Sequence, residues 1–316
     1  MNTYKLFCFF VIKKEKKLDN LNQYIKINNK MYIRQIKKII KKIKNKKNIG
    51  DSCKNNLCAS GELIIDTIKL MEKDQVNVAL PCLRNIYEMT LKAIVLDDNQ
   101  EIFDSYNKII KNKEKDKMSI IREYIGEDFN KYFSIIEKDE NFNNIIGKGI
   151  LTYVYECLCR YSHATKVNEF VYLVQKDNEL KAYLNNFLFV FIIYPIILIY
   201  VDATCTKIKS YKIDDELFIL SAIVMPDMMN ILLNDKENIN ILSQISERIL
   251  GKPDDLFKIR IDSEKKLINH YAMNCEREIV NSNIQRETWD IVCDYYLSKH
   301  FTKKEREKLD IIKNEK

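Results

Sequence analysis

The sequence predicts an all-α protein, and two observations lead to this fold class. The 316 residues include only 6 Gly and 4 Pro, so residues that form tight turns or interrupt helices are scarce. Apolar residues recur every three or four positions over long stretches, which is the spacing of amphipathic helices. We expect a basic, partly helical leader at 1–50, a helical bundle at 51–210 and a helical C-terminal extension at 211–316.

The positive charge of the chain is concentrated in the leader. Residues 1–50 hold 15 Lys or Arg and two acidic residues, a local charge of +13, so residues 51–316 carry −6 of the total of +7. Within 31–47, a stripe of Ile33, Ile36, Ile40 and Ile43 is surrounded by basic residues. Such a helix contacts nucleic-acid phosphates or anionic lipid, or it is a solvated charge run whose Ile stripe packs on the body. The candidate contact residues are Arg34, Lys37, Lys38, Lys41, Lys42 and Lys44.

The bundle is predicted from successive helical patterns at about 53–73, 75–96 and 150–164, followed by a strongly apolar helix at 187–201. The last segment has fifteen consecutive apolar residues, and its uncharged window extends from 182 to 201. A membrane span needs roughly 20 predominantly apolar residues, whereas a helix at the centre of a bundle is also apolar on all sides. Both interpretations stay open, with the central helix preferred. Membrane contact is therefore an alternative that we do not favour.

Cysteine and histidine usage bears on compartment and cofactors. The nine Cys are odd in number and scattered, and no secretory signal accompanies them, so we expect free thiols and a cytoplasmic, at most membrane-peripheral, protein. Only three His are present, none at a metal-binding spacing. The chain also lacks a phosphate-binding loop and a dinucleotide fingerprint. We expect no metal and no cofactor.

One group of polar residues falls where helical periodicity predicts burial. Arg84 and Glu88 are four residues apart on an apolar helix, so they share a face. Arg160 and His163 are three apart on a second helix, with Ser162 beside them. Because buried charges need partners, we expect the two helices to meet. Arg84, Glu88 and Ser162 then form a network that supports Arg160 and His163, with a purely structural network as the alternative.

Two stretches of the same region carry a family resemblance. VALPCLRNIYEM at 78–89 and CLCRYSHAT at 157–165 resemble motifs of a widespread family of helical bacterial proteins of uncharacterised function. That family is similar in layout to the HEPN superfamily of helical bundles, many of which act in phage defence or as toxins. HEPN ribonucleases pair an Arg and a His four to six residues apart across a symmetric dimer, whereas Arg160 and His163 are three apart.

The resemblance implies a metal-independent endoribonuclease. His163 would act as general acid and base at the ribose 2′-hydroxyl, and Arg160 would stabilise the charge that develops on the phosphate. It also implies a homodimer, RNA as the substrate or ligand, and a partner protein or antitoxin. Whether the chain is an enzyme is left open. The alternatives are a non-catalytic helical binding module and a membrane-associated effector that uses the 187–201 helix.

Overall fold

The computed structural model describes residues 15–96, 152–163, 165–208, 236–250 and 287–314, together with Leu220, Val224, Met228 and Leu232. All regular secondary structure in these ranges is helical, and they contain no strand. The predicted all-α fold is therefore confirmed. The charged segment of the sequence at 99–124 and the shorter one at 127–138 lie outside the described residues.

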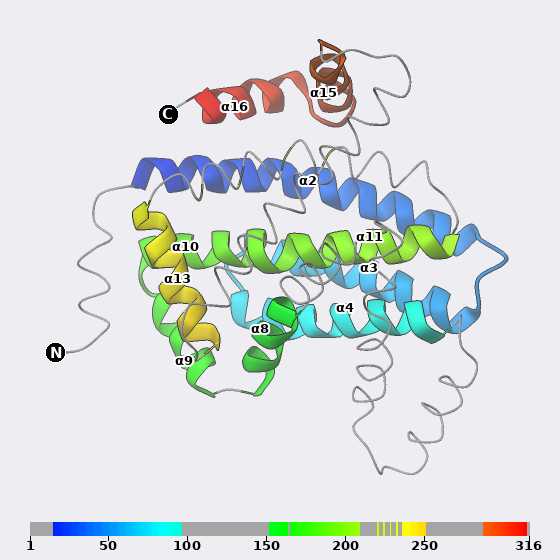
Figure 1. The fold of residues 1–316 in the computed structure, drawn as a ribbon, viewed down its shortest axis with the longest axis horizontal. Coiled ribbons are helices and arrows are strands. Elements are labelled where there is room, and N and C mark those ends of the chain that lie inside the picture. The colour runs from blue at the N-terminus through cyan, green and yellow to red at the C-terminus, as the bar shows by residue number, and fades with distance from the viewer. Residues whose placement is uncertain are drawn as a thin grey trace.

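Three long helices form the first part of the bundle (Figure 1). They are α2 (Glu15–Asn45), α3 (Asp51–Glu72) and α4 (Val76–Leu96). The connections between them are short, and α3 and α4 form the most extensive helix pair. Asp74, in the turn between α3 and α4, has a positive φ of 61°, a left-handed conformation that Asp tolerates better than most residues do.

The apolar segment near residue 190 forms the centre of the bundle (Figure 1). It runs as α10 (Asn178–Leu188), a π-helical turn (η2, Phe189–Ile193) and α11 (Tyr194–Ile208). Every residue from 186 to 198 is buried. Leu180–Val201 is long and apolar enough to cross a membrane, but 89% of its most apolar window is buried inside the protein. This burial is what the central-helix interpretation predicts.

The π-helical turn coincides with a proline. Pro195 has no backbone N–H to donate to the carbonyl four residues earlier, so a regular α-helix would lose one hydrogen bond here. The preceding residue, Tyr194, instead donates its N–H to the Phe189 carbonyl, five residues back. The wider turn therefore carries the helix past Pro195 without a break in the apolar segment.

The remaining helices pack around this core. They are α8 (Thr152–His163), α9 (Thr165–Val174), α13 (Lys236–Leu250), α15 (Glu287–His300) and α16 (Lys303–Asn314). α8 contacts α4 and α13, whereas α16 contacts α2. Helices from all three predicted segments contribute to one hydrophobic core. The predicted division at 50 lies in the connection between α2 and α3, whereas the predicted division at 210 falls outside the described residues.

The helix α16 lies in a strongly charged part of the sequence near the C-terminus. Thr302 begins it as an N-cap: its hydroxyl accepts from the backbone N–H of Glu305 at 3.3 Å, and Glu305 Oε2 accepts from the Thr302 backbone N–H at 2.8 Å. This reciprocal pair is a capping box. Leu309 and Ile312 are buried, which fixes the helix on the body.

Candidate functional site

The inner side of α2 is part of the core. Ile36, Ile40 and Ile43 of the predicted stripe are buried, and Ile33 is partly buried. α2 contacts α3, α10, α11 and α16, so apolar neighbours surround it on more than one side. The stripe therefore packs on the body of the protein, as one of the two interpretations of this helix requires.

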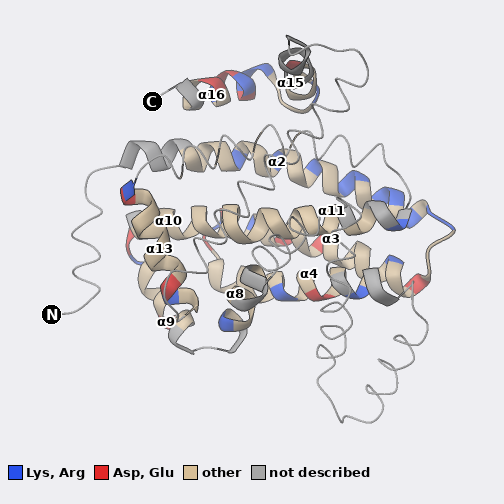
Figure 2. Ribbon diagram, viewed as in Figure 1, with Lys and Arg blue, Asp and Glu red and all other residues tan. Residues whose placement is uncertain are grey.

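The outer side of α2 is a row of basic residues. All six predicted contact residues are exposed, and Figure 2 shows several Lys and Arg positions along the C-terminal half of the helix. Two of the six have partners: Lys44 forms an ion pair with Glu62 at 2.9 Å, and Arg34 donates to the backbone carbonyl of His300. The hydrogen bond and the charge of Glu62 raise the pKa of Lys44.

The four lysines between these two residues have no such contact. Lys37, Lys38, Lys41 and Lys42 are exposed, and no described residue forms an ion pair or a hydrogen bond with their side chains. We call these four residues the lysine patch. Their backbone is fixed by the buried isoleucines on the opposite side of the same helical turns. The lysine patch is thus a positive surface on a rigid support.

The second candidate site lies on α4 and α8, which contact each other as predicted. The Nε of Arg84 and the Oε1 of Glu88 are 2.8 Å apart, and the two side chains are only 20% and 17% exposed. The predicted pair at i and i+4 is therefore present and largely buried. Partial burial strengthens such an interaction relative to a fully exposed ion pair.

Arg160 does not occupy the buried position that its sequence context suggests. Cys157, Leu158 and Tyr161 fill the inner face of α8, and Arg160 is exposed. The expectation that Arg160 is buried is therefore wrong, because the residues next to it in the sequence, and not Arg160, face the core. The side chains of Ser162 and His163, at the C-terminal end of α8, lie outside the described residues. Their predicted roles beside Arg160 stay predictions.

Two polar links made by α2 were not predicted from the sequence. Asn29 Nδ2 donates to Glu72 Oε1 at 3.2 Å, and the Tyr194 hydroxyl donates to Asn29 Oδ1 at 3.1 Å. Near the middle of the helix, Gln35 Nε2 and His300 Nδ1 are 2.6 Å apart, and both side chains are buried. The available signal was the presence of Asn and Gln among the apolar positions of the α2 pattern.

No protein-family model matches the chain, and comparisons with curated proteins and with solved structures give no match. Within the part of the chain that the structure describes, no group of three or more His, Cys, Asp or Glu side chains is placed to hold a metal ion. Cys53, Cys58, Cys82, Cys157 and Cys159, the cysteines whose side chains the structure describes, form no disulfide bond. Any functional interpretation therefore depends on the surfaces and cavities of the protein itself.

Proposed function

We propose that this protein binds RNA through the lysine patch on the outer face of α2. The observation that carries the proposal is the division of α2 into two faces, one buried in the core and one carrying four exposed lysines that no described residue pairs with. Lysines that neutralise phosphates release condensed counterions, which supplies sequence-independent affinity for a nucleic acid. The chain as a whole has a net charge of +7, which also favours a polyanionic ligand.

The packing of α2 favours a phosphate backbone over a lipid surface. An amphipathic helix binds a bilayer by burying its apolar face among the acyl chains. In α2 that face is already occupied by the protein core, and Ile36 and Ile43 are fully buried. Insertion would require the helix to leave the bundle. Binding of RNA phosphates requires only the exposed lysines and no rearrangement of the core.

The proposal predicts binding that depends little on RNA sequence. Lysine ammonium groups contact phosphates as point charges, without the planar geometry with which Arg reads a guanine edge. Phosphate contacts fix the position of a nucleic acid but carry no direct sequence information. We therefore expect similar affinities for unrelated single-stranded RNAs of equal length.

The test compares two variants with the same loss of charge. In one, Lys37 and Lys41 are replaced by Gln; in the other, Lys304 and Lys308, two exposed lysines of α16, are replaced by Gln. Gln has nearly the helix propensity of Lys, so both variants should fold. Fluorescence anisotropy with a labelled 20-nucleotide RNA should show weaker binding for the α2 variant only. Equal affinities of both variants and the parent would refute the assignment.

A second candidate function is the metal-independent endoribonuclease suggested by the family resemblance. The observation that favours it is the contact of α8 with α4, which brings the helix of Arg160 and His163 against the helix of the Arg84–Glu88 pair. Arg160 is exposed and therefore free to approach a substrate. In this hypothesis the HEPN-like chain acts as a homodimer, as a phage-defence or toxin-type effector that an antitoxin partner controls.

This second function is tested by cleavage of labelled tRNA and mRNA in EDTA. The parent should cleave, and the His163→Ala and Arg160→Ala variants should be inactive while they retain the melting temperature of the parent. Cleavage by His163→Ala at the parental rate would remove the ribonuclease hypothesis. It would leave the RNA-binding proposal untouched, because the lysine patch is on a different helix.

A further inference from the structure

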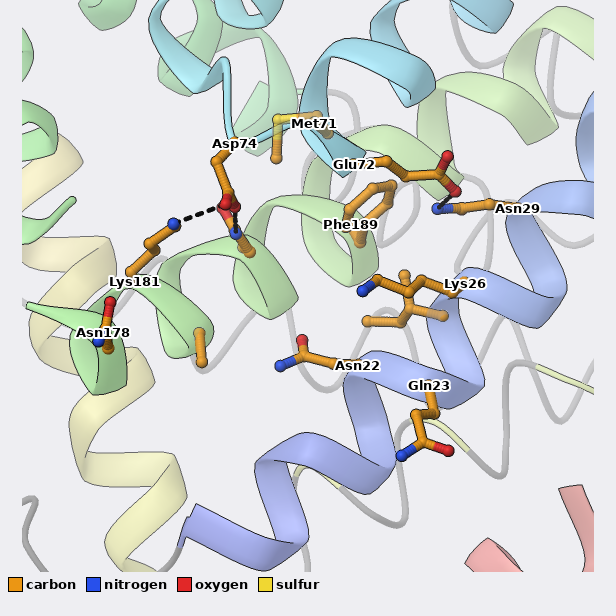
Figure 3. A pocket seen from close by; sticks show the side chains of 13 residues that line it. Asn22, Gln23, Lys26, Asn29, Met71, Glu72, Asp74, Asn178, Lys181 and Phe189 are labelled. Atoms are coloured by element: carbon orange, nitrogen blue, oxygen red, sulfur yellow. Dashed lines mark hydrogen bonds and ion pairs between the residues drawn. The ribbon is translucent and has the colours of Figure 1, made fainter. Parts of the chain in front are cut away.

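A cavity of about 390 Å³ lies between α2, the C-terminal end of α3 with its turn, and the helix α10. Figure 3 shows side chains from these three elements converging on it. Its apolar lining includes Ile25, Met71 and Phe189, all of them buried. Small-molecule sites in proteins usually occupy 300–1,000 Å³, with an apolar lining and a few fixed polar groups. The volume is at the lower end of this range and suits a compact ligand.

One wall of the cavity carries a carboxylate held by a chain of hydrogen bonds. The buried Tyr194 hydroxyl donates to Asn29 Oδ1, and Asn29 Nδ2 donates to Glu72 Oε1. The polar end of Asn29 is therefore satisfied within the protein and its orientation is fixed. A carboxylate has about four acceptor positions, and the hydrogen bond from Asn29 uses one of those of Glu72. The remaining positions are available to a ligand.

The opposite wall is formed around Asp74. Lys181 Nζ is 2.6 Å from Asp74 Oδ2, and Asn185 Nδ2 donates to Asp74 Oδ1 at 3.4 Å. The other polar atom of that amide, Asn185 Oδ1, is shielded from solvent and accepts no hydrogen bond from any described residue. A shielded acceptor without a partner is costly in a folded protein. A donor on a bound ligand would satisfy it.

The charges of the cavity balance, which restricts the class of ligand. The lining contains two lysines, Lys26 and Lys181, and two acids, Glu72 and Asp74. The other polar lining residues are amides, with Asn22 and Gln23 on α2 and Asn178 on α10. A strongly charged ligand gains little from a neutral site. A neutral ligand with hydroxyl groups, amide-like edges and one flat apolar face uses all the features present.

We propose that this cavity binds a nucleoside unit. A ribose diol matches the free acceptor positions of Glu72, because a carboxylate that accepts from a ribose hydroxyl is a recurrent element of nucleotide sites. The Asn and Gln side chains match a base edge, and their paired donor and acceptor suit adenine in particular. Asn185 Oδ1 accepts from the base or the sugar. Phe189 and Met71 provide the apolar surface beneath the flat base.

Such a unit has two sources, a free nucleoside or an unstacked nucleotide of a bound RNA. Proteins that recognise single-stranded RNA commonly accept a splayed base in a pocket while phosphates are held beside it. Lys26, on the cavity wall, and Lys37, in the lysine patch, are both on α2. They are eleven residues, or about 17 Å, apart along the helix and have nearly the same angular position. The cavity proposal goes beyond RNA binding by the lysine patch and does not depend on it.

Calorimetry with the full-length protein and adenosine, guanosine, cytidine and uridine tests the proposal. At least one nucleoside should bind with a dissociation constant below about 1 mM, which corresponds to a weak small-ligand site. Glu72→Gln keeps the acceptor for Asn29 but removes the charge, and it should weaken that nucleoside about 10-fold. The 2′,3′-dideoxy analogue should bind the parent and Glu72→Gln equally. Glu307→Gln, an exposed glutamate of α16, is the matched control and should bind as the parent does.

The outcomes separate this proposal from RNA binding by the lysine patch. Absence of binding by all four nucleosides, with RNA bound normally, overturns a free-nucleoside site. In that case, a loss of RNA affinity in Glu72→Gln but not in Glu307→Gln identifies an RNA nucleotide as the occupant. Equal RNA affinities of these two variants then overturn the cavity proposal entirely. Nucleoside binding that persists in Lys37→Gln/Lys41→Gln, with RNA binding lost, supports two separate contacts.

Discussion

Replacement of Gly61 by Ala should destabilise the protein, although Ala is the better helix former. Gly61 is buried in α3 where that helix meets α2 and α11. A Cβ atom at this position would overlap the Tyr200 hydroxyl and would lie 2.8 and 2.9 Å from Ile40 Cγ1 and Cδ1. Neither neighbour can move freely, because Tyr200 is fully buried and Ile40 is 7% exposed.

The expected size of the effect is a difference of two terms. Overpacking of a filled core destabilises a protein by about 1–3 kcal/mol, whereas replacing Gly by Ala within a helix stabilises it by about 1 kcal/mol. The net destabilisation should therefore be about 1 kcal/mol. Gly61→Val should cost more, about 2–3 kcal/mol, since Val has two methyl groups more than Ala and a lower helix propensity.

Ser60→Ala is a suitable control because it changes the neighbouring buried position of the same helix. The Ser60 hydroxyl is buried and forms no hydrogen bond with a described residue, so its removal should leave stability unchanged or raise it slightly. Urea unfolding followed by circular dichroism gives the free energy of unfolding of each variant from its midpoint. If Gly61→Ala is as stable as the parent, the close approach of α2, α3 and α11 at Gly61 is not what the structure shows.

Two further predictions concern the attachment of the C-terminal helices. Burial disfavours the charged form of Glu305, but its hydrogen bonds from Thr302, with Arg34 and Lys30 nearby, outweigh this and lower its pKa below the ordinary value of 4.5. The stability that Glu305 contributes should be present above pH 4.5 and be lost as the pH falls through the lower folded-state pKa. Urea unfolding of the parent and of Glu305→Gln at several pH values should show that the difference between their free energies of unfolding disappears in acid. Gln35→Leu, which removes a buried partner of His300, should cost about 1–3 kcal/mol. Hydrogen exchange should become faster in α15 and α16 and stay unchanged in α3; uniform acceleration would contradict a local role.

The helices and the core were largely predictable from local pattern. The Ile36, Ile40 and Ile43 stripe of α2 and the apolar segment at 187–201 are buried because helical periodicity and hydrophobicity determine which side faces the core. The Arg84–Glu88 pair was also predictable, since residues four apart on a helix are neighbours. All of these features depend on residues close together in sequence.

Features that depend on distant partners were not predictable. Asn29 is hydrogen-bonded to Tyr194, 165 residues away, and Gln35 is hydrogen-bonded to His300, 265 residues away. No periodic pattern in the sequence identifies such pairs. The burial expected for Arg160 was wrong for a related reason: the rotation of the short helix α8 is set by its packing on α4 and α13. The cavity at Glu72 and Asn185 also requires three elements from separate parts of the chain.

The salt dependence of RNA affinity tests the role of the lysine patch most directly. For a single-stranded nucleic acid, the logarithm of the binding constant falls with the logarithm of salt concentration by about 0.7 per phosphate neutralised. Replacement of Lys37, Lys38, Lys41 and Lys42 by Gln should therefore reduce this slope by about 2.8 when all four lysines contact phosphates. An unchanged slope would show that RNA, if bound at all, contacts another surface.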